Sequence, residues 1–379
     1  MNAKDFLFSI FPKIVGFKLA YHSITQPAGP ITLTFSVTNA CQSRCKTCKI
    51  WKIYPEKIQD QKNELGTDEI EKIFRSMGPV YFFNLSGGEP FLRKDLPEIV
   101  DLAVQYLKPR IIHSPTNGIA TNRILKRTRD ILEGIRKRGL DTPLTIKPSI
   151  DGVGDLHDEI RGYRGNWKRL LATIKGLKEL EREYSNLHLE LGTVVSNFNK
   201  DRLDEIEDFV HSLGIQSYRN EIAEQREEFF NVGEPITPQG GEYADLMRGF
   251  SSKIRKSMRD KKPLAKVTES LRLVYYDLAT RIITENRQVI PCYAGISNVH
   301  LTPHGDLWPC CVIGYSHSMG NLRDSNYDFQ RIWKSARASR VRKFIKDGKC
   351  ACPLANQAYS NIICDFPSLA KALLNIIRF

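Results

Sequence analysis

Three closely spaced cysteines, Cys41, Cys45 and Cys48, have the clearest chemical meaning of any residues in this chain. Thiolates are the usual protein ligands of iron–sulfur clusters, and a cubane cluster has four irons. A loop that supplies three thiolates therefore leaves one iron free to bind a group that is not protein. Structural zinc needs four ligands, commonly from Cys-x2-Cys pairs, and no histidine stands beside this loop. The spacing indicates an iron–sulfur site with an open iron.

The segments around this loop predict how it is positioned. Strand-like and helix-like segments alternate from Ile31 to about Asn220, and the cysteine loop follows the first strand. The expected strands are 31–37, 81–86, 110–116, 145–150, 188–196 and 215–220, and the expected helices are 68–77, 96–107, 121–137, 167–184 and 201–213. Strict alternation predicts parallel strands with right-handed crossovers. Six such units are too few to close an eight-stranded barrel, so the sequence predicts an α/β fold with an open, partial (β/α)6 barrel. Ligands of such folds bind where the loops leave the carboxyl ends of the strands.

The pattern Cys-x3-Cys-x2-Cys after a first strand resembles that of the radical S-adenosylmethionine (radical SAM) enzymes. The resemblance implies that the open iron of a 4Fe–4S cluster binds the amino and carboxylate groups of SAM. It also implies the chemistry: an electron from the reduced cluster cleaves SAM, and the resulting 5′-deoxyadenosyl radical takes a hydrogen atom from a substrate. Gly87, Gly88 and Glu89 follow directly after the second expected strand. Glycines let backbone approach a ligand closely, and the matching Gly-Gly-Glu motif of the family binds the SAM amino group.

Two further residues of the SAM site follow from the same resemblance. Ser149 ends the fourth expected strand, and Arg161 follows it. They match the radical SAM branch with C-terminal auxiliary clusters, in which the serine contacts SAM and the arginine meets its carboxylate through a planar fork. Asp151 is expected to hold the turn. Thr47 departs from the family pattern, which usually has an aromatic residue near the adenine. Either another apolar group covers the base or the nucleotide lies differently; segment 192–195 offers such a surface, or simply packs in the core.

The other six cysteines all lie in the last quarter of the chain, which predicts a second metal-binding unit. Cys292, Gly305 and Cys310 form the pattern Cys-x12-Gly-x4-Cys, which resembles the opening of the SPASM auxiliary-cluster domain. A full SPASM domain has seven cysteines, so six imply a reduced, Twitch-like version with one auxiliary 4Fe–4S cluster. The expected ligands are Cys292, Cys310, Cys352 and Cys364, with Cys350 as the alternative to Cys352.

This ligand set predicts a role for the auxiliary cluster. Four thiolates leave no open iron, so accepting an electron from a substrate radical is favoured over holding the substrate. A net oxidation or a cross-link is therefore expected. Cys311 is expected to be a buried thiol near the cluster, and a structural zinc ribbon is the alternative for the whole unit.

The length and composition of the chain predict how it is organised. Five parts are expected: an apolar lead segment at 1–30, the partial barrel at 31–220, a largely helical bridge at 221–289, the cysteine-rich auxiliary-cluster domain at 290–366 and an amphipathic helix at 367–379.

The odd number of cysteines, nine, argues against a secreted disulfide framework, so a cytoplasmic location is expected. A net charge of +13 favours acidic or phosphorylated partners. Basic segment 331–346 has the periodicity of a core-packing helix with a solvated basic face.

These features together predict a radical SAM enzyme that oxidises a peptide, a protein or a sugar-containing substrate. A reductant such as flavodoxin or ferredoxin would supply the electrons, and no catalytic acid or base is assigned. A non-enzymatic electron carrier or nucleic-acid-binding protein would need neither the Gly-Gly-Glu motif nor the matching serine and arginine. No specific nucleic-acid binding is expected.

An alternative prediction rests on the apolar ends of the chain. Helical faces at both ends could lie on an anionic membrane surface, with the enzyme peripheral at the inner membrane face and acting on a lipid or lipid-linked substrate. The residues of these faces are Phe6, Leu7, Ile10, Phe11, Ile14 and Val15 at one end and Leu369, Leu373, Ile376 and Ile377 at the other. Docking of both ends on the barrel is the favoured interpretation.

Overall fold

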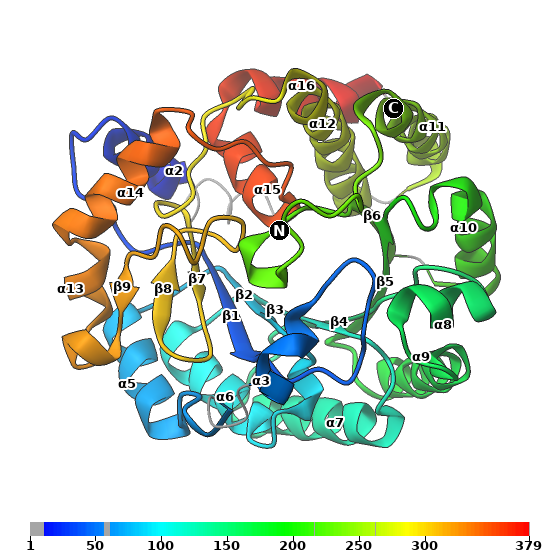
Figure 1. Cartoon of the computed structure of the whole chain (residues 1–379), viewed down its shortest axis with the longest axis horizontal. Helices are drawn as coiled ribbons and strands as arrows, with labels where there is room; N and C mark the ends of the chain where they lie inside the picture. The colour runs from blue at the N-terminus through cyan, green and yellow to red at the C-terminus, as the bar shows by residue number, and fades with distance from the viewer. Residues whose placement is uncertain (1–10, 57–60, 216, 262, 379) are drawn as a thin grey trace.

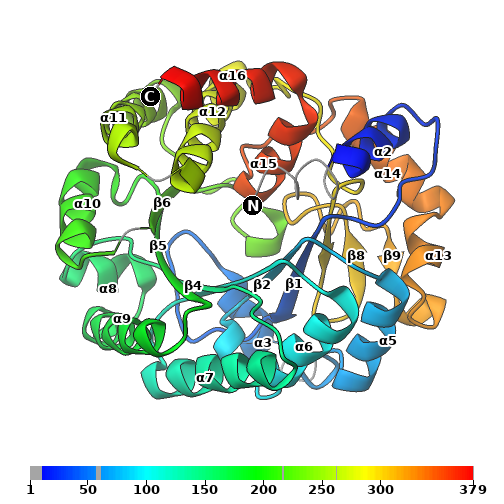
Figure 2. The same cartoon turned by 180° about the vertical axis from the view of Figure 1, so that it is seen from behind.

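The computed structural model describes residues 11–56, 61–215, 217–261 and 263–378. Within this part of the chain, one curved sheet has the strand order β6-β5-β4-β3-β2-β1-β7-β8-β9, with helices around its outside (Figures 1 and 2). The strands are β1 (Thr32–Thr38), β2 (Phe82–Gly87), β3 (Ile111–Thr116), β4 (Leu144–Pro148), β5 (Leu187–Val195), β6 (Ser217–Ile222), β7 (Asn298–Leu301), β8 (Asp306–Trp308) and β9 (Gly320–Asn321). Strands β1 to β6 pair in parallel in chain order. This confirms the predicted open, partial (β/α)6 barrel.

Five helices of the barrel lie where the apolar periodicity predicted them. They are α5 (Thr67–Met77), α6 (Leu96–Leu102) with its π-helical continuation η4 (Ala103–Leu107), α7 (Thr121–Lys137), α9 (Asn166–Glu183) and α10 (Leu203–Ser212). A sixth, α8 (Asp155–Arg161), was not predicted, because seven residues are too few to show a periodic pattern. This short helix matters for the site, since Arg161 is its last residue.

Alternation along β1 explains the two faces of the sheet. Leu33, Phe35 and Val37 are fully buried, and the Phe35 ring packs 6.1 Å from that of Phe74 in α5. The intervening side chains point to the opposite face, because successive residues of a strand alternate. There Ser36 donates a hydrogen bond to Glu228. The helices therefore cover an apolar outer face, and the inner face of the barrel is polar.

The C-terminal region extends the same sheet. Strand β7 pairs in parallel with β1, with Thr34 opposite His300, and β8 and β9 add antiparallel strands beyond it. Strand β7 thus lies beside the first strand, although more than two hundred residues separate the two in sequence. The other elements are α2 (Phe11–Tyr21), η2 (Ile50–Lys52), α3 (Ile53–Glu56), η3 (Pro90–Leu92), η5 (Lys200–Arg202), η6 (Glu227–Phe229), α11 (Gly240–Ser257), η7 (Met258–Asp260), α12 (Pro263–Glu285), η8 (Arg323–Ser325), α13 (Phe329–Trp333), α14 (Ala336–Lys346), α15 (Ala355–Cys364) and α16 (Phe366–Arg378).

The basic segment and the ends of the chain pack on this body. In α13, Trp333 is fully buried and its indole donates to the Ala28 carbonyl at 2.7 Å, which confirms the prediction that the segment packs in the core. Ile14 and Phe17 of α2 are buried, and Ala372 of α16 accepts a hydrogen bond from Ser270. Parts of both terminal faces stay exposed, whereas Phe6, Leu7 and Ile10 of the predicted apolar face lie outside the described residues. No helix among the described residues has the length and apolar character needed to cross a membrane.

Candidate functional site

The loop after β2 is fastened to the cysteine loop. The Gly88 amide donates to the Thr38 carbonyl at 2.7 Å, and the Glu89 amide donates to the Ala40 carbonyl at 2.8 Å. A Cβ at Gly88 would lie 2.2 Å from the Ala40 oxygen, and Gly87, with φ of +105°, would bring a Cβ equally close to Thr38. The sequence interpretation assigned these glycines to the approach of a ligand. In the structure they allow two backbone loops to meet, which fixes the position of the cysteines.

Replacing Gly88 with alanine is expected to lower the rate of SAM cleavage about 100-fold, because the new methyl group displaces the cysteine loop and small misplacements of reacting groups are costly. The assay is 5′-deoxyadenosine formation by the reconstituted protein. Gly134→Ala is the matched control. Nothing lies within 4 Å of a Cβ at this position in α7, so normal activity and a small gain in stability, about 0.5–1 kcal/mol, are expected. Equal activities of the two variants would contradict the proposed role of Gly88.

Glu89 links β2 to β3 beneath the cysteine loop. Its buried carboxylate accepts hydrogen bonds from the Phe91 amide at 3.2 Å, the Thr116 hydroxyl at 2.9 Å and the Asn117 amide at 2.7 Å. Burial raises the pKa of Glu89 to about 7, although these hydrogen bonds act in the opposite direction. The Asn117 side chain in turn lies 3.8 Å from the Cys41 sulfur. The carboxylate therefore positions the loop, and its remaining lone pairs could accept from an ammonium group.

The three N-terminal thiols lie near one another. Burial raises the pKa of Cys41 to about 12, and the neighbouring Cys45 and Glu89 add to this effect. Burial also raises the pKa of Cys48, with further contributions from Cys45 and Cys41. Half-buried thiols that lie this close together would repel one another as thiolates, and a coordinated metal both neutralises and deprotonates such thiols. The donor set thus fits a three-thiolate iron–sulfur cluster.

Arg161 reaches this group of thiols from the end of α8. Its carbonyl accepts hydrogen bonds from the Ser43 hydroxyl at 2.9 Å and the Arg44 amide at 3.0 Å, so the cysteine loop lies against the end of the helix. Its guanidinium lies 3.5 Å from the Cys45 sulfur and 3.3 Å from Asp151. The Arg161 Nε is buried without a hydrogen-bond partner. Buried donors of this kind usually have a partner, so this position suits a ligand with a carboxylate.

The remaining predicted SAM residues lie at the same edge of the sheet. The half-buried Ser149 continues β4, and its amide donates to the Thr116 carbonyl at 3.0 Å. Asp151 accepts from the Val194 amide at 2.8 Å, as expected for a residue that holds the turn, and it also orients Arg161. Thr47 is buried, and its carbonyl accepts from the Asn231 side chain at 2.7 Å.

Four C-terminal cysteines form a second group, which contains Cys350 in place of the predicted Cys364. Burial raises the pKa of Cys292 to about 12, with Cys310 and Cys350 adding to it. Burial likewise raises the pKa of Cys352, with Glu224, Cys310 and Cys292 as the next contributors. The structure thus brings Cys292, Cys310, Cys350 and Cys352 together. Cys350 and Cys352 can both belong to the group because the segment that contains them is not helical, and residues i and i+2 of such a segment can project to one side.

Cys364, which the sequence placed among the expected ligands, lies apart from this group in the structure. It ends α15 and packs in a separate apolar cluster with Ile14, Phe17 and Tyr293. Burial raises its pKa to about 12, and the charged groups that modify it are Lys18 and Asp365, not another thiol. The sequence placed Cys364 in a cysteine-rich region, but only the packing of α15 against α2 shows which way its side chain points.

The segment that follows β6 contributes residues to the site that were not expected from the sequence. The sequence interpretation assigned residues 221–289 to a helical bridge, but the first part returns to the thiols. Glu224 raises the pKa of Cys352, and Arg226 pairs with Glu224 at 2.8 Å. Glu228 contributes to the raised pKa of Cys48. Charged residues that follow directly on the end of a strand were the available indication, because strand ends face the site.

The two groups of thiols fall in the regions matched by known families. Residues 35–225, about half of the chain, match the model of the Radical SAM superfamily, and residues 292–353 match SPASM, an iron–sulfur cluster-binding domain. The second match includes Cys292, Cys310, Cys350 and Cys352 and ends before Cys364.

Individual proteins are similar over much of the chain. The antilisterial bacteriocin subtilosin biosynthesis protein AlbA of Bacillus subtilis (strain 168) is 21% identical over 355 residues, which cover 89% of this chain and 69% of AlbA. The PqqA peptide cyclase of Bradyrhizobium diazoefficiens is 28% identical over 200 residues, 51% of this chain and 46% of the cyclase. The crystal structure of Streptococcus suis SuiB bound to S-adenosylmethionine has a TM-score of 0.60 at 16% identity, over 86% of this chain and 70% of that chain. The structural likeness shows the fold.

Proposed function

The chain belongs to the radical SAM superfamily, and we propose that it is a member that oxidises a peptide by using S-adenosylmethionine and two 4Fe–4S clusters. The observation that carries this proposal is the presence of two separate groups of half-buried thiols in loops of one barrel, with charged residues of the segment after β6 close to both groups. Peptides are favoured as substrates because AlbA takes part in bacteriocin biosynthesis and the PqqA cyclase acts on a peptide, as their names state. Proteins and sugar-containing molecules are the other candidates.

Each group of residues has an assigned task in this proposal. Cys41, Cys45 and Cys48 bind the first cluster, which when reduced supplies the electron that cleaves SAM to methionine and a 5′-deoxyadenosyl radical. Glu89, Ser149 and Arg161 would hold SAM, with Arg161 assigned to its carboxylate, and Gly87 and Gly88 let the loop after β2 meet the cysteine loop. Cys292, Cys310, Cys350 and Cys352 bind the auxiliary cluster. An acidic one-electron carrier such as flavodoxin or ferredoxin suits the net charge of +13 as the reductant.

The four-thiolate auxiliary site supports oxidation as the outcome. With all four irons bound by protein, this cluster has no position for a substrate, so its chemical use is to accept an electron. A cluster held by Cys292, Cys310, Cys350 and Cys352 would accept one electron; with the loss of one hydrogen atom to the 5′-deoxyadenosyl radical and of one proton, the substrate would lose two hydrogens.

The test is mass spectrometry of peptides encoded beside the gene, incubated with reconstituted protein, SAM and dithionite under anaerobic conditions. A peptide product lighter by two hydrogens is expected. Cys310→Ala should still form 5′-deoxyadenosine but should give no such product, because only the acceptor is lost. Full product formation by Cys310→Ala would overturn the assigned role of the auxiliary cluster. Turnover of a sugar or protein, with no change in any peptide, would overturn the substrate class.

A further inference from the structure

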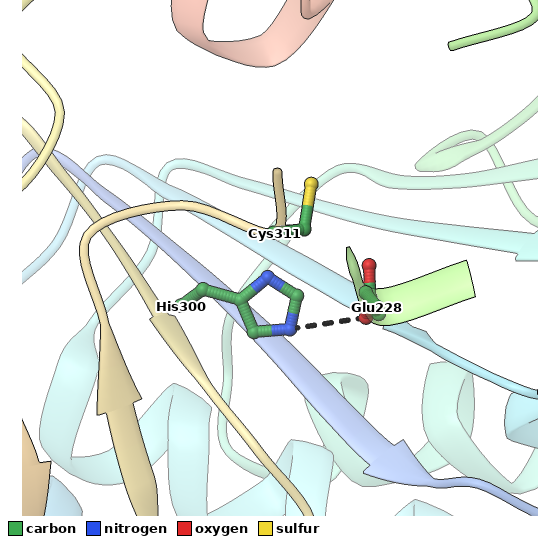
Figure 3. A group of neighbouring side chains, drawn as sticks. All are labelled: Glu228, His300 and Cys311. Carbon is green, nitrogen blue, oxygen red and sulfur yellow. Dashed lines mark ion pairs between the residues drawn. The ribbon is translucent and has the colours of Figure 1, made fainter. Parts of the chain in front are cut away.

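A third group of metal-binding side chains lies between the two groups of cysteines. Glu228 in η6, His300 in β7 and Cys311 after β8 each offer one ligand atom, and these atoms lie within 4.8 Å of one another. Figure 3 shows the three side chains on separate segments, with a dashed line for the ion pair between His300 and Glu228. All three are buried, with exposed fractions of 4%, 2% and 7%. Neither cluster uses any of them in the proposed assignment.

Hydrogen bonds and strand pairing hold this arrangement. His300 Nε2 lies 3.3 Å from a Glu228 oxygen and 2.7 Å from the Ser36 hydroxyl, which itself donates to Glu228 at 2.8 Å. The Glu228 amide donates to the Cys311 carbonyl at 3.4 Å, which keeps η6 beside the loop after β8. The ring of Trp308 lies 5.4 Å from that of His300 and closes one side. The donors are therefore positioned by the fold and do not depend on a mobile surface loop.

The donor set has the chemistry of a transition-metal site. Imidazole nitrogen, thiolate sulfur and carboxylate oxygen are the usual ligands of zinc, and three protein ligands with one open position are typical of catalytic zinc. A buried carboxylate beside a buried thiol is costly without a cation. The Arg226 guanidinium pairs with Glu224 at 2.8 Å and also interacts with Cys311 and Glu228, so one cation faces three acidic groups.

We propose that Glu228, His300 and Cys311 bind one divalent transition-metal ion, with zinc as the best match, and leave its fourth coordination position open. The Ser36 hydroxyl orients the two ligands that it contacts, as second partners of metal ligands commonly do. The Lys49 amide, next to Cys48, donates to the carbonyl of Phe229, next to Glu228, at 2.8 Å, and Cys311 is bonded to Cys310, so the ion would lie between the two clusters. If the proposed function is correct, an oxygen atom of the substrate could occupy the open position.

The experiment counts zinc in the holoprotein. Protein with both clusters reconstituted is dialysed anaerobically against zinc chloride, desalted and analysed for zinc and iron by mass spectrometry, and the zinc is then examined by X-ray absorption. We expect one zinc per chain, with one sulfur at about 2.3 Å and nitrogen or oxygen neighbours at about 2.0 Å. His300→Ala and Glu228→Gln should each lower zinc affinity at least about 100-fold, and Ser36→Ala about 10-fold.

Controls separate this site from the clusters and from misfolding. His188→Ala removes an exposed histidine and should leave the zinc content unchanged. Iron content and 5′-deoxyadenosine formation report whether each variant is folded, and neither depends on zinc. If His300→Ala does not fold, Cys311→Ser provides the same test. The proposal is overturned if the wild type retains no zinc, if zinc persists in the folded variants, or if Cys311→Ser loses iron, which would make Cys311 a cluster ligand. Failure of SAM cleavage would count against the proposed function alone.

Discussion

Replacing Cys41, Cys45 and Cys48 together with alanine is expected to abolish 5′-deoxyadenosine formation, a fall of about a thousandfold or more. In the proposed function, the electron comes from the cluster assigned to these thiolates, so without them the rate should return to the uncatalysed level. The measurement is chromatographic detection of 5′-deoxyadenosine after incubation of reconstituted protein with SAM and dithionite. Iron content should fall by about four per chain, since one cubane cluster is lost.

Cys364→Ala is the matched control for this experiment. Cys364 is also a buried cysteine, but it packs in the apolar cluster beside α2 and not with either group of thiols. Its replacement should leave both iron content and SAM cleavage at the wild-type level. Continued SAM cleavage by the triple variant would contradict the assignment of the first cluster.

The second large effect concerns the ligands of the auxiliary cluster. Cys350→Ala and Cys352→Ala should each lower the iron content from about eight to about four per chain, because loss of one thiolate releases a four-iron cluster. Cys350 and Cys352 both belong to the group that surrounds Cys292 and Cys310. SAM cleavage should persist in both variants, since the first cluster lies on other residues. Elemental analysis and Mössbauer spectra of anaerobically reconstituted protein provide the measurement.

The iron contents of Cys350→Ala and Cys364→Ala distinguish the two ligand sets most clearly. The Gln288 side chain donates to the Cys350 carbonyl at 2.9 Å, which fixes the segment beside the cluster group. If Cys364→Ala lost four irons and Cys350→Ala kept all eight, the revised ligand set would be wrong and the set expected from the sequence would stand.

The barrel could be predicted from the sequence because its elements are long and periodic. Helices such as α7, with 17 residues, show an apolar stripe, and strand β1 shows alternation. Strands β7, β8 and β9 have only four, three and two residues, too few for a pattern. The pairing of β7 with β1 joins distant parts of the chain, and nothing local in either segment encodes it. The sequence alone therefore could not predict that the C-terminal region extends the barrel sheet.

The candidate site divides in the same way. Cys41, Cys45 and Cys48 could be recognised because they lie in one loop, where spacing alone limits what they can bind. His300 and Glu228 come from an unrecognised strand and from the presumed bridge, so only folding brings them together. Whether Cys350 or Cys364 is a ligand of the auxiliary cluster depends on which way the face of α15 that carries Cys364 points. The packing of α15 determines that direction.

Electron–nuclear double resonance on the reduced protein tests the central claim most directly. SAM labelled with ¹⁵N in its amino group and ¹⁷O in its carboxylate is added to reconstituted protein, and Arg161→Lys serves as a comparison that weakens the carboxylate contact. Hyperfine coupling of both labels to the cluster of the Cys41 loop is predicted, because that cluster has one iron without a protein ligand. A fully formed cluster whose spectrum does not change with SAM, and which shows no coupling to either label, would contradict this account.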